Sequence, residues 1–185
     1  VEMTTAEAFL TFARIDLEAH DEAGSLAEAA RSRGLMVPDG ASWDDVYNQA
    51  FVNWVEPALP QDRPLVLSQY PARVECLAAD IPGTPWKDRW ELYVMGMELA
   101  NCYTECSDPD AVLGSMKAEA ARKAGQAFPH RVDFSYAEVF EGFPPCSGVA
   151  MGFDRFFMVL TGRTDIQDVL LFPFEETFGR WGNRN

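Results

Sequence analysis

An acid-rich segment from Glu91 to Glu105 constrains this sequence more than any other part of it. Its β-favouring residues fall into two short runs, and Gly96 lies where a tight turn would join them. Acids such as Glu98 are disfavoured inside strands unless a cation or a hydrogen-bond donor meets them. The segment therefore predicts a β-hairpin that is either a binding site or the solvent-facing side of an ordinary edge hairpin.

The spacing of the acids in this hairpin adds a condition. Side chains alternate along a regular strand, so Glu98 and Glu105, seven residues apart, would face opposite sides. If both contribute to one pocket, a bulge or twist must lie between them. Carboxylates from Glu91 and Glu98 would suit Mg²⁺, which takes one or two carboxylates together with substrate phosphates. Asn101 and Glu105 would then be available to hold a cationic amine.

The composition limits the classes of protein to which this chain can belong. Its 185 residues, 48% of them hydrophobic, suffice for one domain with its own core. A net charge of -14 argues against direct nucleic-acid binding, which depends on clustered Lys and Arg. No apolar run is long enough to span a membrane, and four cysteines within apolar or strand-like segments favour reduced thiols and a cytoplasmic location. The first residue is Val1, so the chain is either processed or a piece of a longer one.

Three helices are predicted in residues 1–60, which we expect to form a helical subdomain. Thr4 and Ser25 are each followed three positions later by Glu, the pattern of a capping box, and the second of these helices covers Ser25 to Arg33. Ser42 starts the third helix, and its apolar face ends at Pro57.

Residues 61–185 are expected to form a sheet that includes the hairpin. The predicted elements are a strand at Leu65–Tyr70, a helix from Asp108 to Gly125, a shorter helix from Asp133 to Gly142, and a strand that passes into a helix within Pro145–Leu160. Helices that alternate with antiparallel-looking strands indicate an α+β fold rather than a doubly wound parallel sheet.

A second candidate site runs from Gly148 to Arg155. Glycines at 148 and 152 would let a ligand approach the backbone, and Arg155 at a helix start could meet a polyphosphate through charge-assisted hydrogen bonds. The alternative is tight strand-to-helix packing, with Asp154 and Arg155 as a structural ion pair. Neither of the common glycine-rich nucleotide motifs is present here.

Together the two motifs resemble those of class II lysyl-tRNA synthetases and, more closely, of their elongation factor P–lysine ligase relatives. Residues 98–105 read Glu-Leu-Ala-Asn-Cys-Tyr-Thr-Glu and are similar to the family's Glu-Leu-Ala-Asn-Gly-Phe-x-Glu. Residues 146–155 are similar to the ligase form of class II motif 3. Three further segments follow the ligase pattern, so the likeness covers nearly the whole chain: Ala6–Asp16, Phe51–Pro57 and Asp168–Pro173.

This resemblance implies a fold and a set of nucleotide-binding residues. The fold would be the class II synthetase-like antiparallel sheet flanked by helices, with residues 1–185 as its C-terminal part, lacking motif 1 and motif 2. The implied cofactors are ATP and Mg²⁺. Glu91 and Glu98 match the acids that serve both, and the backbone beside Leu99 and Gly152 would line the nucleotide. Arg155 would meet its terminal phosphate and is the catalytic candidate.

The resemblance also implies a substrate and a reaction. Asn101 and Glu105 match positions that recognise lysine, and Ala100 stands where lysyl-tRNA synthetases usually carry glycine and the ligases alanine. Lysine or β-lysine would be activated as an adenylate and joined to a lysine of elongation factor P. Cys102 and Tyr103 depart from the family's Gly and Phe and add bulk near the amino-acid pocket.

The same resemblance leaves three alternatives open. Because the motif 2 arginine is outside this sequence, we expect the isolated chain to activate little, and a missing N-terminal half or a homodimer partner would complete the site. The runner-up to the ligase function is a non-catalytic binding or regulatory module that keeps the fold but not turnover. It could also be a fragment of a lysyl-tRNA synthetase.

Overall fold

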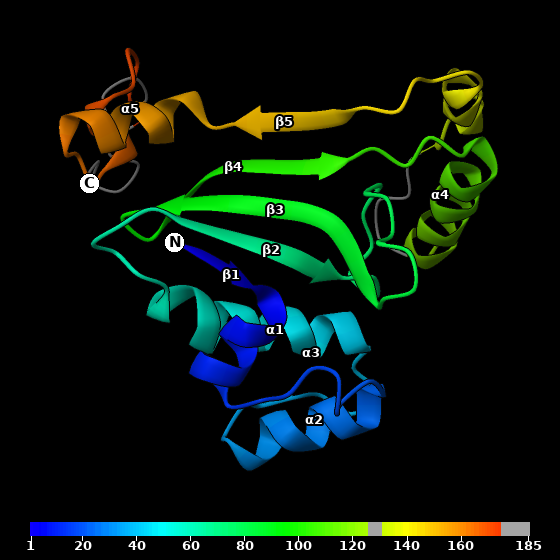
Figure 1. Cartoon of the computed structure of the whole chain (residues 1–185), viewed down its shortest axis with the longest axis horizontal. Coiled ribbons are helices and arrows are strands. Elements are labelled where there is room, and N and C mark those ends of the chain that lie inside the picture. Colours follow the sequence, from blue (N-terminus) through cyan, green and yellow to red (C-terminus); the bar gives the residue numbers. More distant parts are fainter. Residues whose placement is uncertain (126–130, 175–185) are drawn as a thin grey trace, which may run out of the picture.

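A five-stranded sheet organises the residues that the computed structural model describes, 1–125 and 131–174 (Figure 1). The strands are β1 (Glu2–Thr4), β2 (Leu65–Pro71), β3 (Trp86–Val94), β4 (Met97–Thr104) and β5 (Ser147–Met151). They lie side by side in chain order, and β1 and β2 run parallel whereas the other neighbours are antiparallel. The predicted α+β class is therefore confirmed.

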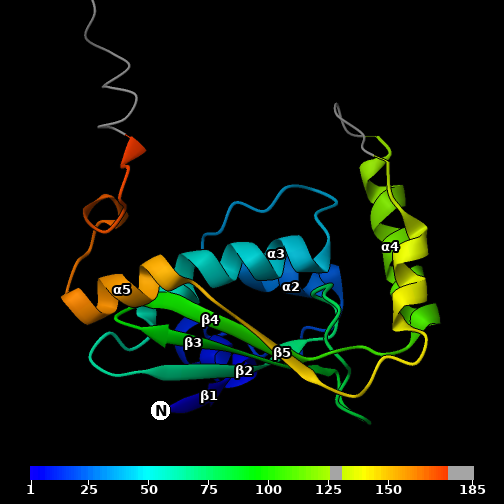
Figure 2. The same ribbon diagram turned by 90° about the horizontal axis from the view of Figure 1, so that it is seen from above.

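Residues 5–58 form a helical layer that packs against the β1–β3 half of the sheet (Figures 1 and 2). Its elements are α1 (Thr5–Ala8), the π-helical turn η1 (Phe9–Ala13), α2 (Ala23–Ser32), α3 (Trp43–Ala50), the π-helical turn η2 (Phe51–Val55) and the 3-10 turn η3 (Glu56–Ala58). Their apolar side chains share one buried cluster with Leu65, Leu67 and Tyr93 of the sheet. The helical layer and the sheet thus have a common core.

Capping boxes mark two of the three predicted helix starts. The Thr4 side chain accepts a hydrogen bond from the Glu7 N–H, and the Glu7 carboxylate accepts one from the Thr4 N–H at 2.8 Å. Ser42 and Asp45 make the same reciprocal pair at the start of α3. Each box satisfies amide groups that have no partner within the first turn of a helix, which explains why these residues fix the two starts.

The second helix starts earlier than predicted. α2 begins at Ala23, and Ser25 lies inside it with its hydroxyl 2.6 Å from Nδ1 of His20 rather than on the helix amides. The predicted capping role of Ser25 is therefore wrong. Gly34 follows the helix with a φ of 91°, the left-handed conformation that is common just after the end of a helix.

The acid-rich segment forms the predicted hairpin, in which β3 and β4 are joined by a two-residue turn. Met95 and Gly96 have φ values of 54° and 74°, the combination found in type I′ turns. Such a turn matches the twist of the two flanking strands, so the hairpin closes without a longer loop.

A bulge in β4 provides the break in alternation that the spacing of the acids requires. Leu92 pairs with Ala100 and Tyr93 pairs with Glu98, so Leu99 is an extra residue on β4. One extra residue inverts the alternation of side chains along a strand. Glu98 consequently lies on the same face of the sheet as the odd-numbered residues of β4 beyond the bulge.

The remaining elements lie at the two ends of β5 (Figures 1 and 2). They are α4 (Pro109–Lys123), the 3-10 helix η4 (Phe134–Phe140), α5 (Phe153–Thr161) and the 3-10 turn η5 (Ile166–Asp168). α4 begins after the predicted cap Asp108 but ends two residues before Gly125, and the helix predicted from Asp133 is 3-10 rather than α. Within the described residues, no helix is long and apolar enough to cross a membrane.

Candidate functional site

Polar side chains gather on one face of β3 and β4. Arg89 pairs with Tyr103 and Glu91 pairs with Asn101, and residues paired across antiparallel strands point to the same face. Glu105 follows two positions after Tyr103 and shares that face by alternation. The helical layer covers the same face of β2 and part of β3, so this polar group extends from the border of the covered area toward β5.

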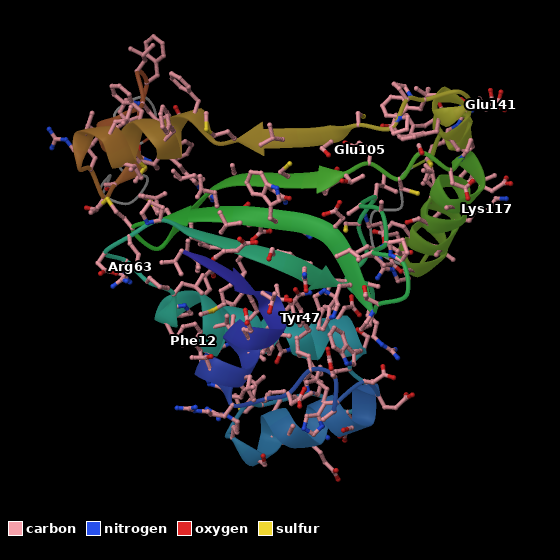
Figure 3. The ribbon with its side chains drawn as sticks, viewed as in Figure 1. Phe12, Tyr47, Arg63, Glu105, Lys117 and Glu141 are labelled. Atoms are coloured by element: carbon pink, nitrogen blue, oxygen red, sulfur yellow. The ribbon has the colours of Figure 1, made fainter. Side chains whose placement is uncertain are left out.

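A hollow of about 380 Å³ lies where β4 meets β5, and we call it the β4–β5 hollow. Its lining consists of Asn101, Tyr103, Glu105, Gly148, Val149 and Ala150. Figure 3 shows Glu105 between the ends of these two strands. Asn101 and Glu105, which the resemblance assigns to recognition of an amino acid, thus line the same hollow.

Glu105 occupies this hollow because residue 148 has no side chain. Its Oε1 atom lies 2.7 Å from the position that a Cβ at Gly148 would take, closer than any real contact of that kind. The Glu105 side chain is partly buried, and within residues 1–125 and 131–174 it makes no hydrogen bond or ion pair. A carboxylate in such surroundings is a good partner for a cation that enters the hollow.

Glu91 differs from Glu105 in having its own partners. It is 6% exposed, and its Oε2 atom accepts hydrogen bonds from the hydroxyls of Tyr70 and of Tyr93, the latter at 2.7 Å. Burial, and then the negative charge of Glu91, raise the pKa of both tyrosines, so both hydroxyls keep their protons and donate. These bonds satisfy one oxygen of a buried carboxylate.

Arg89 satisfies the other oxygen of Glu91. Its Nη2 atom donates to Oε1 of Glu91 at 2.5 Å, and its Nε donates to Oδ1 of Asn101 at 3.3 Å. The guanidinium carbon also lies 4.4 Å from the centre of the Tyr70 ring, a cation–π contact. A continuous set of contacts therefore runs from the buried tyrosines to a residue of the hollow.

The residues assigned to the nucleotide meet at the other end of β4, where α5 begins. Gly152 donates its N–H to the Leu99 carbonyl at 2.8 Å, so the two predicted backbone positions are in contact. Arg155 donates to the Glu98 carbonyl at 2.9 Å, and its Nη1 lies 3.7 Å from Glu98 Oε2. The Arg155 side chain is 51% exposed. Asp154 makes no ion pair with Arg155 among the described residues.

Of the predicted site residues, only Asn101 and Glu105 line the β4–β5 hollow. Ala100 pairs with Met151 and alternates away from Asn101, so its side chain points to the opposite face of the sheet. Glu98 lies near α5, and burial followed by the charge of Glu91 raises its pKa. Within the described residues no group of three or more acids, histidines or cysteines is arranged to hold a metal ion.

Three residues of this site were missed by the sequence reasoning. Tyr70 and Tyr93 bind Glu91, and Arg89 links Glu91 to Asn101. Alternation could have revealed two of them, because Arg89, Glu91 and Tyr93 are spaced by two along one strand. Tyr70 comes from another strand, β2, and its pairing with β3 depends on a shift in register between Ser68 and Tyr70. No local sequence pattern predicts this shift, so the contact of Tyr70 with Glu91 could not be foreseen.

Comparison with known proteins identifies the family to which this chain belongs. The model of the family described as tRNA synthetases class II (D, K and N) matches residues 11–176. The chain belongs to this family.

Individual relatives carry the description Lysine--tRNA ligase. The chain is 36% identical over 162 residues to a protein described as Lysine--tRNA ligase from Staphylococcus aureus strain MRSA252, covering 86% of this chain and 32% of that protein. It is 35% identical over 162 residues to the protein of the same description from Chloroflexus aurantiacus, covering 86% and 33%. The chain thus spans about a third of the length of the curated relatives it matches.

Proposed function

We propose that this chain carries one wall of a site that activates lysine, or β-lysine, with ATP, and that the acceptor of the activated amino acid is a lysine of elongation factor P. The observation that carries the proposal is the carboxylate of Glu105, which lies in the β4–β5 hollow without a partner among the described residues. A substrate ammonium would supply the missing partner. Similarity to lysine--tRNA ligases supports the same amino acid.

Asn101 adds a second requirement for the ligand. Arg89 has only donors, so Asn101 must turn its Oδ1 atom toward Arg89 and its amide NH₂ elsewhere. Because Asn101 lines the hollow, that NH₂ is available to an acceptor oxygen of the ligand. Asn101 lies on β4 and Glu105 directly follows the strand, four residues further along, or about 13 Å at the usual rise of a strand. An extended ligand with a cation at one end and an oxygen acceptor nearer the other fits this arrangement.

The end of β4 near α5 is the proposed place for the ATP phosphates. Arg155 is half exposed, and Gly152 begins α5 without a side-chain cap, so the first amides of this helix are open to an anion. For Mg²⁺ the described residues fit only in part. Glu98 offers one accessible carboxylate, whereas Glu91 is occupied by donors, so a bound magnesium ion would depend on nucleotide phosphates for its other ligands.

The proposed reaction needs positioning rather than a nucleophile from the protein. An oxygen of the lysine carboxylate would bond to the α-phosphorus of ATP as pyrophosphate leaves. The acceptor amine would then attack the carbonyl carbon as AMP leaves, forming an amide. Glu105 and Asn101 would hold the amino acid, and Arg155 would hold the phosphates.

The acceptor separates two forms of this proposal. Ala100, which stands where the ligases of elongation factor P carry alanine, favours a protein acceptor. The similarity to proteins described as Lysine--tRNA ligase favours a transfer RNA acceptor for the complete protein, of which this chain would be the C-terminal part. A non-catalytic module that binds lysine is the third form.

Lysine-dependent exchange between ATP and pyrophosphate tests the activity. We expect little exchange from residues 1–185 alone and a clear increase when the N-terminal half of a family member is added. Radiolabelled lysine should then transfer to elongation factor P rather than to tRNA. Lysine binding without any exchange, with or without the added half, would favour the non-catalytic module, and the absence of both would contradict the proposal.

A further inference from the structure

Glu91 is a buried carboxylate whose hydrogen bonds leave little room for a metal ion. Both of its oxygens already have donors, two tyrosine hydroxyls on Oε2 and the guanidinium of Arg89 on Oε1 at 2.5 Å. A magnesium ion would have to displace these donors and would bring a second positive charge close to a guanidinium whose side chain is only 16% exposed. Magnesium also retains several waters, which need space that a residue 6% exposed does not offer.

Arg89 is held from three sides. Glu91 accepts from its Nη2, the Tyr70 ring lies beneath its guanidinium, and Asn101 accepts from its Nε. Two hydrogen bonds in its plane and one aromatic ring against its face restrain the planar guanidinium, so the Nε–H points in one direction. The orientation of the Asn101 amide is therefore set by Arg89, and the orientation of Arg89 is set by Glu91.

We propose that Glu91 is a positioning residue that acts through Arg89 to fix the Asn101 carboxamide with its NH₂ toward the β4–β5 hollow, and that it is not a metal ligand. Tyr70 and Tyr93 hold Glu91 from the buried side. The inference rests on the proposed function only for the identity of the ligand, because the arrangement of these side chains exists without one.

The first test observes Asn101 without any substrate. In ¹H–¹⁵N spectra of residues 1–185, the side-chain amide pair of Asn101 is assigned by its loss in Asn101→Asp. In Glu91→Gln we expect this pair to move and to broaden, because Arg89 loses its anionic anchor. Arg89→Lys should have the same effect while leaving a cation beside Glu91, so it serves where Glu91→Gln fails to fold. An unchanged Asn101 pair in a folded variant would overturn the proposal.

The second test uses Mg²⁺ alone as the probe. Titration of the wild-type chain with MgCl₂ should leave the Arg89 Hε resonance and the ring resonances of Tyr70 and Tyr93 in place. Movement of these resonances at a saturable magnesium concentration, abolished in Glu91→Gln, would place the ion at Glu91 and overturn the proposal. Glu141→Gln is the control, since it also removes one carboxylate charge but from an exposed position outside the site.

The third test measures lysine affinity by calorimetry in magnesium and in EDTA. Loss of a charge-assisted contact should weaken lysine binding by about tenfold in Glu91→Gln, equally in both buffers. A loss confined to the magnesium buffer would contradict the positioning role. If the wild-type chain binds no lysine, the proposed function fails, whereas the spectra of Asn101 still decide this inference.

Discussion

The two halves of the sheet differ in what covers them. In the β1–β3 half, Leu65 and Leu67 are fully buried and Tyr93 is 1% exposed beneath the helical layer. At the β5 end, Val149 is 64% exposed and Phe153 is 72% exposed. β5 is also the last strand of the sheet, and within the described residues its outer edge has no partner.

This difference separates the part of the chain that mainly stabilises the fold from the part that carries the proposed contacts with the ligand. Exposed apolar side chains beside an unpaired strand edge are typical of a surface that other polypeptide covers. Among the described residues, the lining of the β4–β5 hollow comes from β4, β5 and Glu105, and the proposed second wall would cover the same edge. We call the covered β1–β3 part the closed half and the β4–β5 part the open half. We therefore expect substitutions in the closed half to change the stability of the fold, and substitutions in the open half to change ligand binding.

The largest expected effect compares two apolar strand residues, one from each half. Leu67→Ala should lower the free energy of unfolding by about 2–5 kcal/mol, because a filled core cannot close over the lost methyl groups. Val149→Ala should change it by about 0.5 kcal/mol or less. Urea denaturation at one fixed protein concentration measures both. Equal losses would show that the two halves are covered alike.

The next effect concerns the space beside Gly148 that the Glu105 carboxylate occupies. A methyl group at residue 148 would collide with the Glu105 carboxylate, so Gly148→Ala should weaken lysine binding by about tenfold with little change in the fold. The control is Gly114→Ala, since a Cβ at this α4 position meets nothing within 4 Å. That variant should keep lysine affinity and gain about 0.5–1 kcal/mol of stability. Retained affinity in Gly148→Ala would mean that the position of Glu105 is unimportant for binding.

A smaller effect is expected at the capping box of the helical layer. Ser42→Ala should cost about 1 kcal/mol of stability at neutral pH. Hydrogen bonds from Ser42 hold the pKa of Asp45 below its ordinary value of 3.8, so their contribution is present above that value and is lost as the pH falls through the lowered pKa. The difference between wild type and variant should shrink in strong acid. Denaturant unfolding at neutral and at acidic pH measures it, and a constant difference would contradict this linkage.

The smallest expected effect is a pH dependence in the open half. Burial, and then Glu91, raise the pKa of Glu98 above its ordinary 4.5, so this carboxyl remains protonated to a higher pH than usual. Magnesium-dependent binding of ATP should therefore strengthen as the pH rises through this range, because only the carboxylate attracts the ion. Glu98→Gln should flatten the profile measured by calorimetry. The same profile in wild type and variant would assign the pH dependence to another group.

Local sequence patterns accounted for much of the fold. Cap residues such as Thr4 and Ser42, and the turn at Met95–Gly96, use short-range hydrogen bonds or backbone conformations that a few neighbouring residues determine. Ser25 shows where this reasoning fails. The hydroxyl pairs with His20, which precedes the helix, and the capping pattern of the sequence could not distinguish these two partners.

The site could be predicted only in part for a similar reason. The need for a bulge between Glu98 and Glu105 followed from counting residues, and Leu99 supplies it. The different surroundings of Glu91 and Glu105 did not follow, since Tyr70 approaches Glu91 from another strand and Gly148 leaves room for Glu105 from β5. Contacts between segments far apart in the chain decide which acid is satisfied and which is open.

The central claim is that Glu105 binds the ammonium of a lysine-type substrate, and calorimetric titration of L-lysine tests it most directly. The account predicts binding to wild type that falls by at least about tenfold in Glu105→Gln, the loss of a charge-assisted contact. Glu141→Gln, which removes an exposed carboxylate near α4 (Figure 3), should bind as wild type does. Equal affinity in wild type and Glu105→Gln would contradict the account.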